Sequence, residues 1–475
     1  MTLLNIAVFI AGAILFALIV PVRWRGVALL VASIAAIYWM QPTLPLRPLD
    51  FVLPTATVIL GVVGWLLTRQ EADISRDNVI TLIVVIAVVL GLALASTTAS
   101  NNGLTGITPS PPPDLIEVIV GLAAVAAMIG TLATLVQDRQ RAIPAAMLLV
   151  IAIFVILKSD PLAQSFSAWL RSQQGRPLFL AQAVDIQWLG FSYVAFRLIH
   201  TLRDRQTGRL PALTLREYLT YLVFFPAYTA GPIDRAERFV KDYRALPVGA
   251  SQMTIGLSRI VIGLFKKFVI ADGLALFALN ATKAIQSQSS GGMWILLYAY
   301  TFRIYFDFSG YSDIAIGLGV LFGITLPENF DRPYLKNSIT AFWQSWHITL
   351  STWVRSYVFT PLSRVLMNRP RKPSPVVVVL VTQVTTMVVI GLWHGITLNF
   401  VLWGLWHGIG LWVHKLFTDR TRTFYQGLNE KPLLRRAANW TGILLTFHFV
   451  ALGWVFFALP DTALSFSVLR RLFGG

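Results

Sequence analysis

Uninterrupted apolar runs are the feature that most limits what this chain can fold into. About 20 consecutive apolar residues allow an α-helix to cross the hydrocarbon core of a bilayer. Several runs in the first part of the chain approach or reach this length, namely 3–20, 52–67, 79–95, 115–136 and 142–157. The sequence therefore predicts an integral membrane protein built of helices.

Composition and the distribution of arginine support this prediction. Of the 475 residues, 56% are hydrophobic and only 13% are charged, whereas soluble domains carry about 25% charged residues. The loop 200–216 holds four arginines and the loop 159–174 holds one, an alternation typical of a multi-pass protein with basic loops in the cytoplasm. We expect an all-α polytopic bundle of the cytoplasmic membrane, with about 11 to 14 transmembrane or re-entrant helices around a central funnel.

Net charge and cysteine content limit the classes of function. The net charge is +17, but basic residues form no cluster in a soluble region. We therefore expect no nucleic-acid partner and attribute the charge to cytoplasmic loops. The chain contains no cysteine, which excludes disulfides, thiol nucleophiles, acyl-cysteine intermediates and cysteine-ligated metals.

The character of the apolar segments changes near residue 178. The helices expected in 1–177, about six spans, consist of Val, Ile, Leu and Ala with few polar residues, and we interpret this domain as a scaffold. In 178–475 the apolar segments also contain Asp, Arg, His, Ser and Tyr. Ionisable residues at membrane depth are costly and usually face a functional cavity. We therefore expect the chemistry in 178–475.

The stretch GLWHGITLNFVLWGLWHGIGL, residues 391–411, contains Leu-Trp-His-Gly twice. Thirteen residues of continuous helix would point His394 and His407 in different directions, so no metal pair is expected there. Glycines flank Trp393 and His394, and interrupted helices at membrane depth are tolerated where they line a cavity. With Asn399 close behind, the first copy suits the lining of a polar funnel. For His407, packing within the bundle is at least as good an interpretation.

A third Trp-His pair lies in AFWQSWHITLSTWVRSYVFTPL, residues 341–362. Its Trp and Tyr residues, including Trp346, fall at helical spacing and predict one aromatic stripe on one helix. His347, Ser351 and Arg355 follow at i, i+4 and i+8 and predict a neighbouring polar ridge. A helix lying in the membrane interface explains the stripe, but it explains the ridge less well because such a helix prefers lysine. We expect the segment not to span the bilayer.

Three further charged residues are candidates for the site. Asp307 and Asp313 lie among aromatic residues, but two acids six residues apart do not share a helix face, which argues against a carboxylate pair. Arg235 follows a Gly-Pro helix stop and Asp234. It either forms a local ion pair there or binds an anionic carrier or phosphate.

The remaining histidines are ambiguous. His200 and His414 lie at expected helix ends beside basic residues, where a position at the membrane interface explains them. His448 lies in TFHFVALGW, where a packed histidine and a functional histidine cannot be distinguished.

Five segments, taken in order, resemble signatures of the membrane-bound O-acyltransferase family, in the bacterial branch that modifies cell-envelope polymers. Three carry most of the resemblance: IYFDFSGYSDIAIGLGVLFGITLPENFDRPYL, FWQSWHITLSTWVRSYVFTPL and GLWHGITLNFVLWGLWHGIGL. WLGFSYVAFRLIHTLRDR and VFFPAYTAGPIDRAERF fit the same branch. Each motif alone would be weak, but five in order are specific. The resemblance covers 188–475 and leaves the amino-terminal helices uncovered.

This resemblance implies acyl transfer through the membrane, from a thioester donor on the cytoplasmic side to a hydroxyl on the outer side. It also implies that His394, in the Trp-His-Gly motif, is the catalytic histidine and that His347 is a second catalytic position. A neutral imidazole can take the proton of a hydroxyl as the hydroxyl attacks a thioester carbonyl. Without cysteine or a Gly-x-Ser-x-Gly elbow, direct transfer without an acyl-enzyme is the simpler scheme.

One departure from the family pattern concerns the polar ridge. Relatives commonly have Arg-Asp-Tyr where this chain has Arg-Ser-Tyr at 355–357, so the partner of the arginine is undefined. No metal and no bound cofactor are expected. The residues expected to support catalysis or line the funnel are Trp346, Ser351, Arg355, Trp393, Asn399, Asp307, Asp313, Arg235 and His407.

The resemblance leaves two subfamilies open. YFDFSGYSD and LPENF resemble members that acetylate exopolysaccharides, and GPIDRAERF resembles members that move D-alanine from a carrier protein onto teichoic acid; we favour acetylation. Expected partners are the lipid bilayer, acetyl-coenzyme A or an acyl carrier protein, and an envelope glycopolymer or an extracytoplasmic acyl-relay protein. A transporter or flippase is the alternative of another class, but the chain lacks paired interrupted segments in two matching halves.

Overall fold

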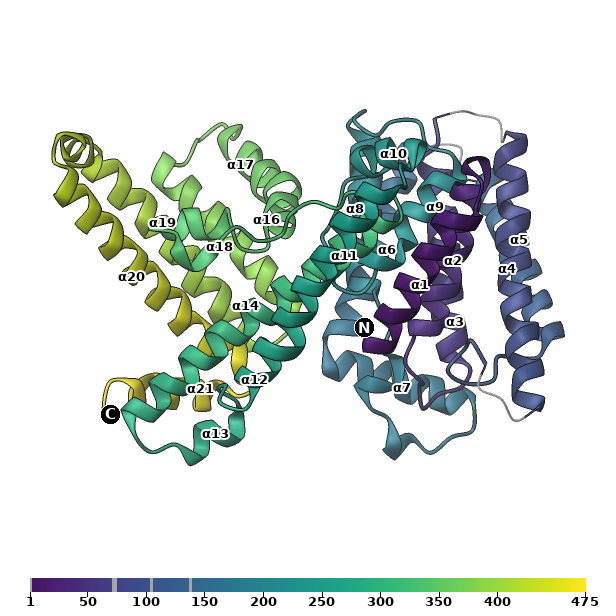
Figure 1. Cartoon of the computed structure of the whole chain (residues 1–475), viewed down its shortest axis with the longest axis horizontal. Coiled ribbons are helices and arrows are strands. Elements are labelled where there is room, and N and C mark those ends of the chain that lie inside the picture. Colours follow the sequence, from purple (N-terminus) through teal and green to yellow (C-terminus); the bar gives the residue numbers. More distant parts are fainter. Residues whose placement is uncertain (1, 71–74, 103–105, 136–138) are drawn as a thin grey trace. The chain divides into compact units, whose positions relative to one another are not determined.

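A computed structural model describes residues 2–70, 75–102, 106–135 and 139–475. Across these residues the regular structure is helical, and the β pairing is limited to an isolated antiparallel bridge between Phe330 and Trp346. The predicted all-α class is therefore confirmed. Figure 1 shows the helices in chain order.

The chain divides into two compact units. The first unit consists of Met1–Ile260 and Ala315–Leu326, and the second of Val261–Ile314 and Pro327–Gly475. The boundaries fall inside two helices, α11 (Ala250–Leu264) and α14 (Ser290–Leu321). The boundary expected near residue 178 separates scaffold helices from catalytic helices, not two compact units, and it stays a prediction.

The apolar runs of the first unit form helices, as predicted. The five runs correspond to α1 (Leu3–Ile19), α3 (Leu49–Thr68), α4 (Arg76–Asn101), α5 (Leu115–Leu135) and α6 (Arg139–Lys158), and α2 (Arg25–Met40) is a further helix between the first two. Residue 136, the last of its run, lies outside the described residues. The segment 159–174, expected to be a loop, is instead α7 (Asp160–Gln173), because Arg171 Nε and Ser167 Oγ both donate hydrogen bonds to Asp185, at 2.9 and 2.6 Å.

A buried arginine of α8 joins the elements that follow it in the first unit. Arg197 is 2% exposed and donates to the backbone carbonyls of Tyr221, Leu222 and Ala227 at 2.7–3.0 Å. The last carbonyls of a helix have no partner within it, so this guanidinium closes the end of α9. The remaining elements are η1 (Val22–Trp24), η2 (Leu178–Leu180), η3 (Ala183–Ile186), α8 (Phe191–Gln206), α9 (Leu215–Val223), η4 (Phe225–Ala227) and α10 (Ala236–Ala245).

The second unit contains two stretches of π-helix, η5 (Phe265–Ala271) and η7 (Arg355–Phe359). Single π-helical turns are rare and occur frequently at functional sites. The other elements are α12 (Asp272–Ala275), α13 (Ala281–Gln286), η6 (Pro333–Leu335), α15 (Ile339–Trp343), α16 (Ile348–Val354), α17 (Thr360–Met367), α18 (Pro375–His394), α19 (Leu398–Gly427), η8 (Leu428–Glu430), α20 (Pro432–Ala458) and α21 (Thr462–Leu472).

Several helices are long and apolar enough to cross a bilayer, which confirms a multi-pass membrane protein. Within the described residues they are Val22–Met40, Leu49–Thr68, Arg76–Asn101, Arg141–Lys158, Pro375–His394 and Pro432–Ala458. Leu3–Ile19 and Leu115–Thr131 are apolar but shorter. The expected total of spanning or re-entrant helices and the central funnel stay predictions.

Candidate functional site

The stretch with the repeated Leu-Trp-His-Gly folds as a helical hairpin. α18 ends at His394, and α19 begins at Leu398 after a turn of three residues. Thr397 caps α19 by accepting a hydrogen bond from the N–H of Phe400 at 3.5 Å. The predicted interruption after His394 is therefore confirmed, and Gly395 is the residue at which α18 stops.

Glycine allows the two helices of the hairpin to approach each other closely. A Cβ on Gly391 would overlap the carbonyl oxygen of Phe400, and one on Gly404 would lie 2.6 Å from the Cα of Val388. Small residues at such contacts let the backbones of membrane helices come together. Backbone packing therefore determines the place of His394 at the end of α18.

Aromatic rings surround the imidazole of His394. The ring centroids of Trp393 and Phe457 lie 4.5 and 4.7 Å from it, and those of Trp403 and Phe400 lie 5.9 Å away. Three of these contacts are edge-to-face, a favourable arrangement of aromatic rings. His394 nevertheless stays partly exposed. The imidazole is therefore packed between aromatic rings but not completely enclosed by the protein.

The segment 341–362 is not the continuous helix that the aromatic spacing predicts. α15 ends at Trp343 and α16 begins at Ile348. Trp346 lies between the two helices, in the antiparallel bridge with Phe330. The prediction of one aromatic stripe on one helix is therefore wrong, because the backbone of this interval pairs with a distant loop instead of continuing the helix.

His347 begins α16 with a left-handed backbone conformation, at φ 44° and ψ 54°. This conformation costs a residue other than glycine roughly 1–2 kcal/mol, and strain of this kind is often found at functional sites. The residue lies outside the helices that could span a membrane, and burial lowers the pKa of the His347 imidazole to about 3, which keeps the ring neutral. The backbone strain and burial mark His347 as a specifically placed side chain.

The two nitrogens of His347 have different surroundings. The side chain is 2% exposed. Nδ1 lies 3.0 Å from Oδ1 of Asn329. Nε2 is buried and has no hydrogen-bond partner among the described residues. Buried polar atoms are nearly always hydrogen-bonded, so Nε2 is a candidate for contact with a substrate.

Trp393 contacts both predicted catalytic histidines. Its ring centroid lies 6.1 Å from that of His347 and 4.5 Å from that of His394. Phe308 of α14 covers the His347 ring edge-to-face at 4.7 Å. The structure thus brings together two histidines from separate motifs, and we take this group of rings as the candidate active site.

The other residues of the predicted polar ridge have different surroundings. Ser351 Oγ donates to the carbonyl of Trp346 at 3.3 Å. Arg355 is exposed at the start of η7 and has no acidic partner in the described parts of the chain. Ser356, at the position of the family's acid, donates to the carbonyl of Thr352 at 3.0 Å. The Ser356 hydroxyl is therefore bonded to the preceding turn of its own helix. The exposed guanidinium of Arg355 faces solvent and can bind a ligand.

His407 is completely buried among aromatic rings. Its centroid lies 4.9 Å from Trp403, 5.2 Å from Trp343 and 5.8 Å from Phe449. Neither ring nitrogen has a hydrogen-bond partner in the described part of the structure. Contacts between an N–H and an aromatic face are weak but real. These surroundings support the packing interpretation.

Asn399 joins three helices. Its Nδ2 donates to the carbonyl of Leu459 at 2.6 Å and to Ser465 Oγ at 3.1 Å, and its Oδ1 accepts from Thr462 Oγ1 at 2.6 Å. The side chain is 2% exposed. It therefore ties the start of α19 to the end of α20 and to α21, and its lining of a funnel stays a prediction.

Asp307 and Asp313 each pair with a lysine. Lys266 Nζ lies 2.7 Å from Asp313, and Lys267 forms an ion pair with Asp307. Both lysines belong to η5 and both acids to α14. The acids therefore have separate cationic partners, which agrees with the expectation that they do not act as a carboxylate pair.

Arg235 belongs to the first unit, at the start of α10, and lies 3.8 Å from Glu237. The local ion pair considered for this segment is present, but the acid that pairs with Arg235 is Glu237. Asp234 pairs with Arg238 one helical turn later, and it also accepts the backbone N–H of Arg235, at 2.7 Å. The helical spacing i, i+4 brings the guanidinium of Arg238 over the carboxylate.

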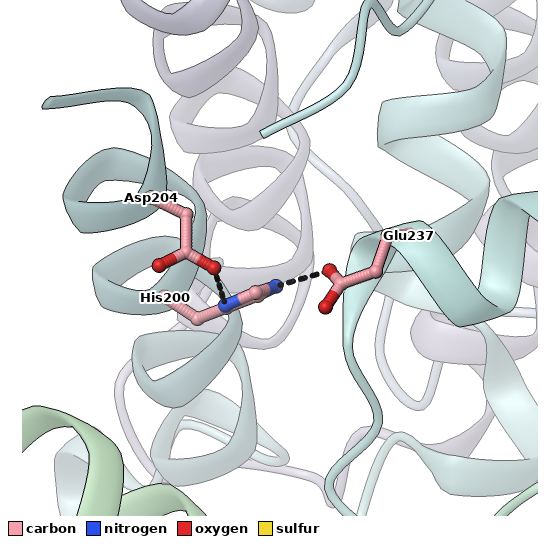
Figure 2. A group of neighbouring side chains, drawn as sticks. All are labelled: His200, Asp204 and Glu237. Atoms are coloured by element: carbon pink, nitrogen blue, oxygen red, sulfur yellow. Dashed lines mark ion pairs between the residues drawn. The ribbon is translucent and has the colours of Figure 1, made fainter. Parts of the chain in front are cut away.

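The sequence did not reveal a buried cluster around His200. Figure 2 shows His200 between Asp204, on the same helix, and Glu237 at the start of α10. Nδ1 lies 3.1 Å from Asp204, and Nε2 lies 3.8 Å from Glu237. The side chain is 1% exposed. α10 therefore packs over α8 and covers the ring of His200, and the expected interfacial position stays a prediction.

This cluster has the composition of a metal site, since its candidate ligand atoms lie within 4.8 Å of one another. However, Nε2 of His200 accepts a hydrogen bond from the backbone N–H of Ala236 at 3.0 Å. The proton of the neutral ring is then on Nδ1, which faces Asp204. Arg209 also lies 3.0 Å from Asp204. Both imidazole nitrogens are engaged within the protein, so the cluster fits a clamp between α8 and α10 better than a metal site.

The other two histidines have structural contacts. His448 Nδ1 donates to the carbonyl of Leu444 at 2.8 Å, so Nε2 accepts from the hydroxyl of Tyr298 at 2.9 Å. His414 Nδ1 lies 3.0 Å from Thr340 Oγ1. Hydrogen bonds within the second unit therefore explain both side chains.

Comparison with known proteins gives a family match. The sequence model of MBOAT, the membrane-bound O-acyltransferase family, matches residues 144–455. This range contains the helical hairpin, α16 and most of the first-unit helices that follow α5. It begins before the first segment that carries the resemblance in the sequence.

Similar proteins include both an alanyltransferase and acetyltransferases. The teichoic acid D-alanyltransferase of Streptococcus thermophilus is 34% identical over 285 residues, covering 58% of this chain and 68% of that protein. A probable alginate O-acetylase of Pseudomonas syringae is 34% identical over 287 residues, 60% of this chain and 51% of the relative. The peptidoglycan O-acetyltransferase of Helicobacter pylori is 36% identical over 261 residues, covering 54% and 46%. The chain thus spans about half the length of these two acetylating relatives.

Proposed function

The chain belongs to the membrane-bound O-acyltransferase family, and we propose that it moves an acetyl group from a cytoplasmic thioester to a hydroxyl of an extracytoplasmic envelope polysaccharide. The donor is acetyl-coenzyme A or an acyl carrier protein, and the enzyme works in the cytoplasmic membrane. The acceptor is the polymer itself or an extracytoplasmic relay protein that passes the acetyl group on. The donor already carries an activated acyl group, so the reaction needs no bound cofactor.

The observation that carries this proposal is the contact of both His347 and His394 with Trp393. Both imidazoles lie in the second unit, and one of them keeps a buried nitrogen without a partner among the described residues. The partly exposed His394 supports proton transfer from a hydroxyl, because imidazole is a base near neutral pH and a general base typically contributes about 10² to 10⁴-fold.

The proposed reaction is a direct transfer. His394 takes the proton of the acceptor hydroxyl while the oxygen attacks the thioester carbonyl. The new C–O bond forms, the C–S bond breaks, and the leaving thiolate recovers the proton from the imidazolium. The chain has no cysteine, so no acyl-thiol intermediate on the protein takes part.

D-alanyl transfer toward teichoic acid is the second candidate. One observation favours it: the aligned region covers 68% of the D-alanyltransferase but 51% and 46% of the two acetylating relatives. The donor would then be a D-alanyl-loaded carrier protein, and the chemistry at the two histidines would be the same.

Inside-out vesicles containing the protein distinguish these candidates. Radiolabelled acetyl-coenzyme A or a D-alanyl-loaded carrier protein is supplied from outside, with candidate polymers enclosed. Incorporation of acetyl into the polymer without a carrier supports the proposal, and alanine incorporation that depends on the carrier supports the second candidate. If neither label is transferred but a lipid-linked sugar crosses the membrane, both candidates are wrong and a transporter takes their place.

A further inference from the structure

Asn329 is a buried residue, 1% exposed, on the loop between α14 and α15. Its side-chain oxygen is the acceptor for Nδ1 of His347 at 3.0 Å. The same oxygen faces the hydroxyl of Thr349 at 2.8 Å and the backbone N–H of Thr349 at 3.4 Å. Its amide nitrogen donates to Ser312 Oγ at 3.3 Å. Every polar atom of the Asn329 side chain therefore has a partner.

These partners determine which way the amide of Asn329 points. A backbone N–H can only donate, so the Asn329 atom that faces the N–H of Thr349 must be the oxygen. An amide oxygen can only accept. The Nδ1 atom of His347 that shares this oxygen must therefore carry a proton, and in the neutral ring the lone pair is then on Nε2. The tautomer follows from the hydrogen-bond pattern.

The backbone around Asn329 holds both residues in place. The N–H of Ile348 donates to the carbonyl of Asn329 at 3.0 Å, and the N–H of Asp331 donates to the carbonyl of Ser345 at 3.0 Å. These bonds flank the bridge between Phe330 and Trp346. The loop of Asn329 is thus fastened to the left-handed turn from which His347 projects.

We infer that Asn329 is a positioning residue, which holds His347 as the Nδ1–H tautomer so that Nε2 accepts a hydrogen bond from the hydroxyl to be acylated. Nε2 is the nitrogen without a partner among the described residues. Phe308 and Trp393 contact the ring of His347 and restrict its rotation. The inference rests on the proposed function for the identity of the hydroxyl, and it assigns His347 to orienting the acceptor while His394 takes the proton.

Kinetic tests use two substitutions at Asn329. Asn329→Leu removes the acceptor, and we expect kcat/KM for acyl transfer to fall about 10- to 100-fold, as for the loss of one buried hydrogen-bond partner. Asn329→Asp keeps an oxygen toward His347 and Thr349, and we expect it to recover most of this loss. Equal losses in the two variants would contradict the inference, and so would an Asn329→Leu enzyme within about twofold of the wild type.

A matched control separates positioning from stability. Asn78 of the first unit is also buried, 6% exposed, and its Oδ1 accepts a hydrogen bond from the N–H of Leu215 at 2.8 Å. Asn78→Leu removes a comparable acceptor far along the chain from the histidine motifs. We expect Asn78→Leu to lower thermal stability without changing kcat/KM of the folded protein. A similar loss of kcat/KM in Asn78→Leu would mean that the loss in Asn329→Leu comes from unfolding.

The tautomer is measured directly by ¹⁵N NMR of protein labelled at histidine, with His347 assigned by comparison with the His347→Asn variant. We expect a protonated Nδ1 and an unprotonated Nε2 in the wild type, and a mixture of tautomers in Asn329→Leu. A wild-type ring protonated on Nε2, or an unchanged tautomer in Asn329→Leu, would overturn the inference. This measurement needs no substrate, so it tests the inference even if no acyl transfer is found and the proposed function fails.

Discussion

The region around His200 in the first unit and the region around His347 in the second contain equally buried histidines with different hydrogen bonding. His200 is 1% exposed and His347 is 2% exposed. Nε2 of His200 accepts the backbone N–H of Ala236, whereas Nε2 of His347 has no partner among the described residues. Both histidines have one nitrogen directed to an acceptor, Asp204 or Asn329.

This difference shows that burial alone does not identify a reactive histidine. A buried donor or acceptor without a partner costs about 1–3 kcal/mol, so each one needs an explanation such as a catalytic role or a bound water. In the first unit, Nη1 and Nη2 of the buried Arg197 likewise donate to three carbonyls. These nitrogens hold α8 to the end of α9, whereas Nε2 of His347, whose ring contacts Trp393, has no partner among the described residues.

The largest expected effect is on catalysis in the second unit. We expect His394→Ala to lower acyl transfer by about 10³-fold, since it removes the proposed general base. The fold should survive, because the ring is partly exposed at the end of α18. Label transfer per mole of purified protein measures the loss, and gel filtration in detergent checks the fold. His407→Ala is the matched control from the second Leu-Trp-His-Gly, and a greater loss there would move the catalytic role to His407.

A smaller loss of acyl-transfer activity is expected when His347 is replaced, because its Nε2 is the nitrogen that distinguishes the two regions. We expect His347→Asn to lower kcat/KM by about 10²-fold, within the usual range for a group that positions a proton. Asparagine tolerates the left-handed backbone at this position better than most residues, so the turn before α16 should persist. Steady-state acylation rates measure the effect. Wild-type rates in this variant would remove His347 from the reaction.

Close packing of the hairpin should affect activity less. We expect Gly391→Ala to force α18 and α19 apart and to cost about 1–3 kcal/mol, as overpacking does. Gly91→Ala in α4 is the matched control, because a Cβ there meets nothing within 4 Å and alanine favours helix by about 1 kcal/mol. Thermal unfolding in detergent compares the two variants. An equal change in unfolding temperature for both would show that glycine is not needed at the α18–α19 contact.

The smallest effect on activity is expected in the first unit. We expect His200→Gln to destabilise the clamp between α8 and α10 by about 1–3 kcal/mol, while turnover of the folded protein stays within about threefold. Unfolding temperature and label transfer are measured on the same preparation. A tenfold loss of turnover at unchanged stability would give His200 a role in function and remove the contrast between the two regions.

Parts of the fold follow from local sequence pattern. The apolar runs of the first unit predicted helices because length and apolar content limit a segment in lipid to that form. The interruption after His394 followed from its flanking glycines. The break at 344–347 could not be predicted, because Trp343, Trp346 and Leu350 keep helical spacing across a backbone that turns away to pair with Phe330.

The candidate site was predictable only in part. Two motifs pointed to His394 and His347, and the structure brings both rings into contact with Trp393. Asn329 was part of the quoted LPENF motif but had no assigned role, because nothing in its sequence surroundings shows a contact with a residue 18 positions later. The pairing of Lys266 and Lys267 with Asp313 and Asp307 was not predicted either, because the partners lie 47 and 40 positions apart in the sequence.

The sequence by itself determined that this chain is a helical membrane protein and which motifs carry its histidines, since apolar length and residue spacing are local properties of the chain. Only the tertiary structure decided which histidine nitrogens are engaged and which remain available. That outcome depends on hydrogen bonds between residues far apart, such as Ala236 with His200 and Asn329 with His347. Such bonds form only once the loops have placed their donors and acceptors within about 3 Å of each other.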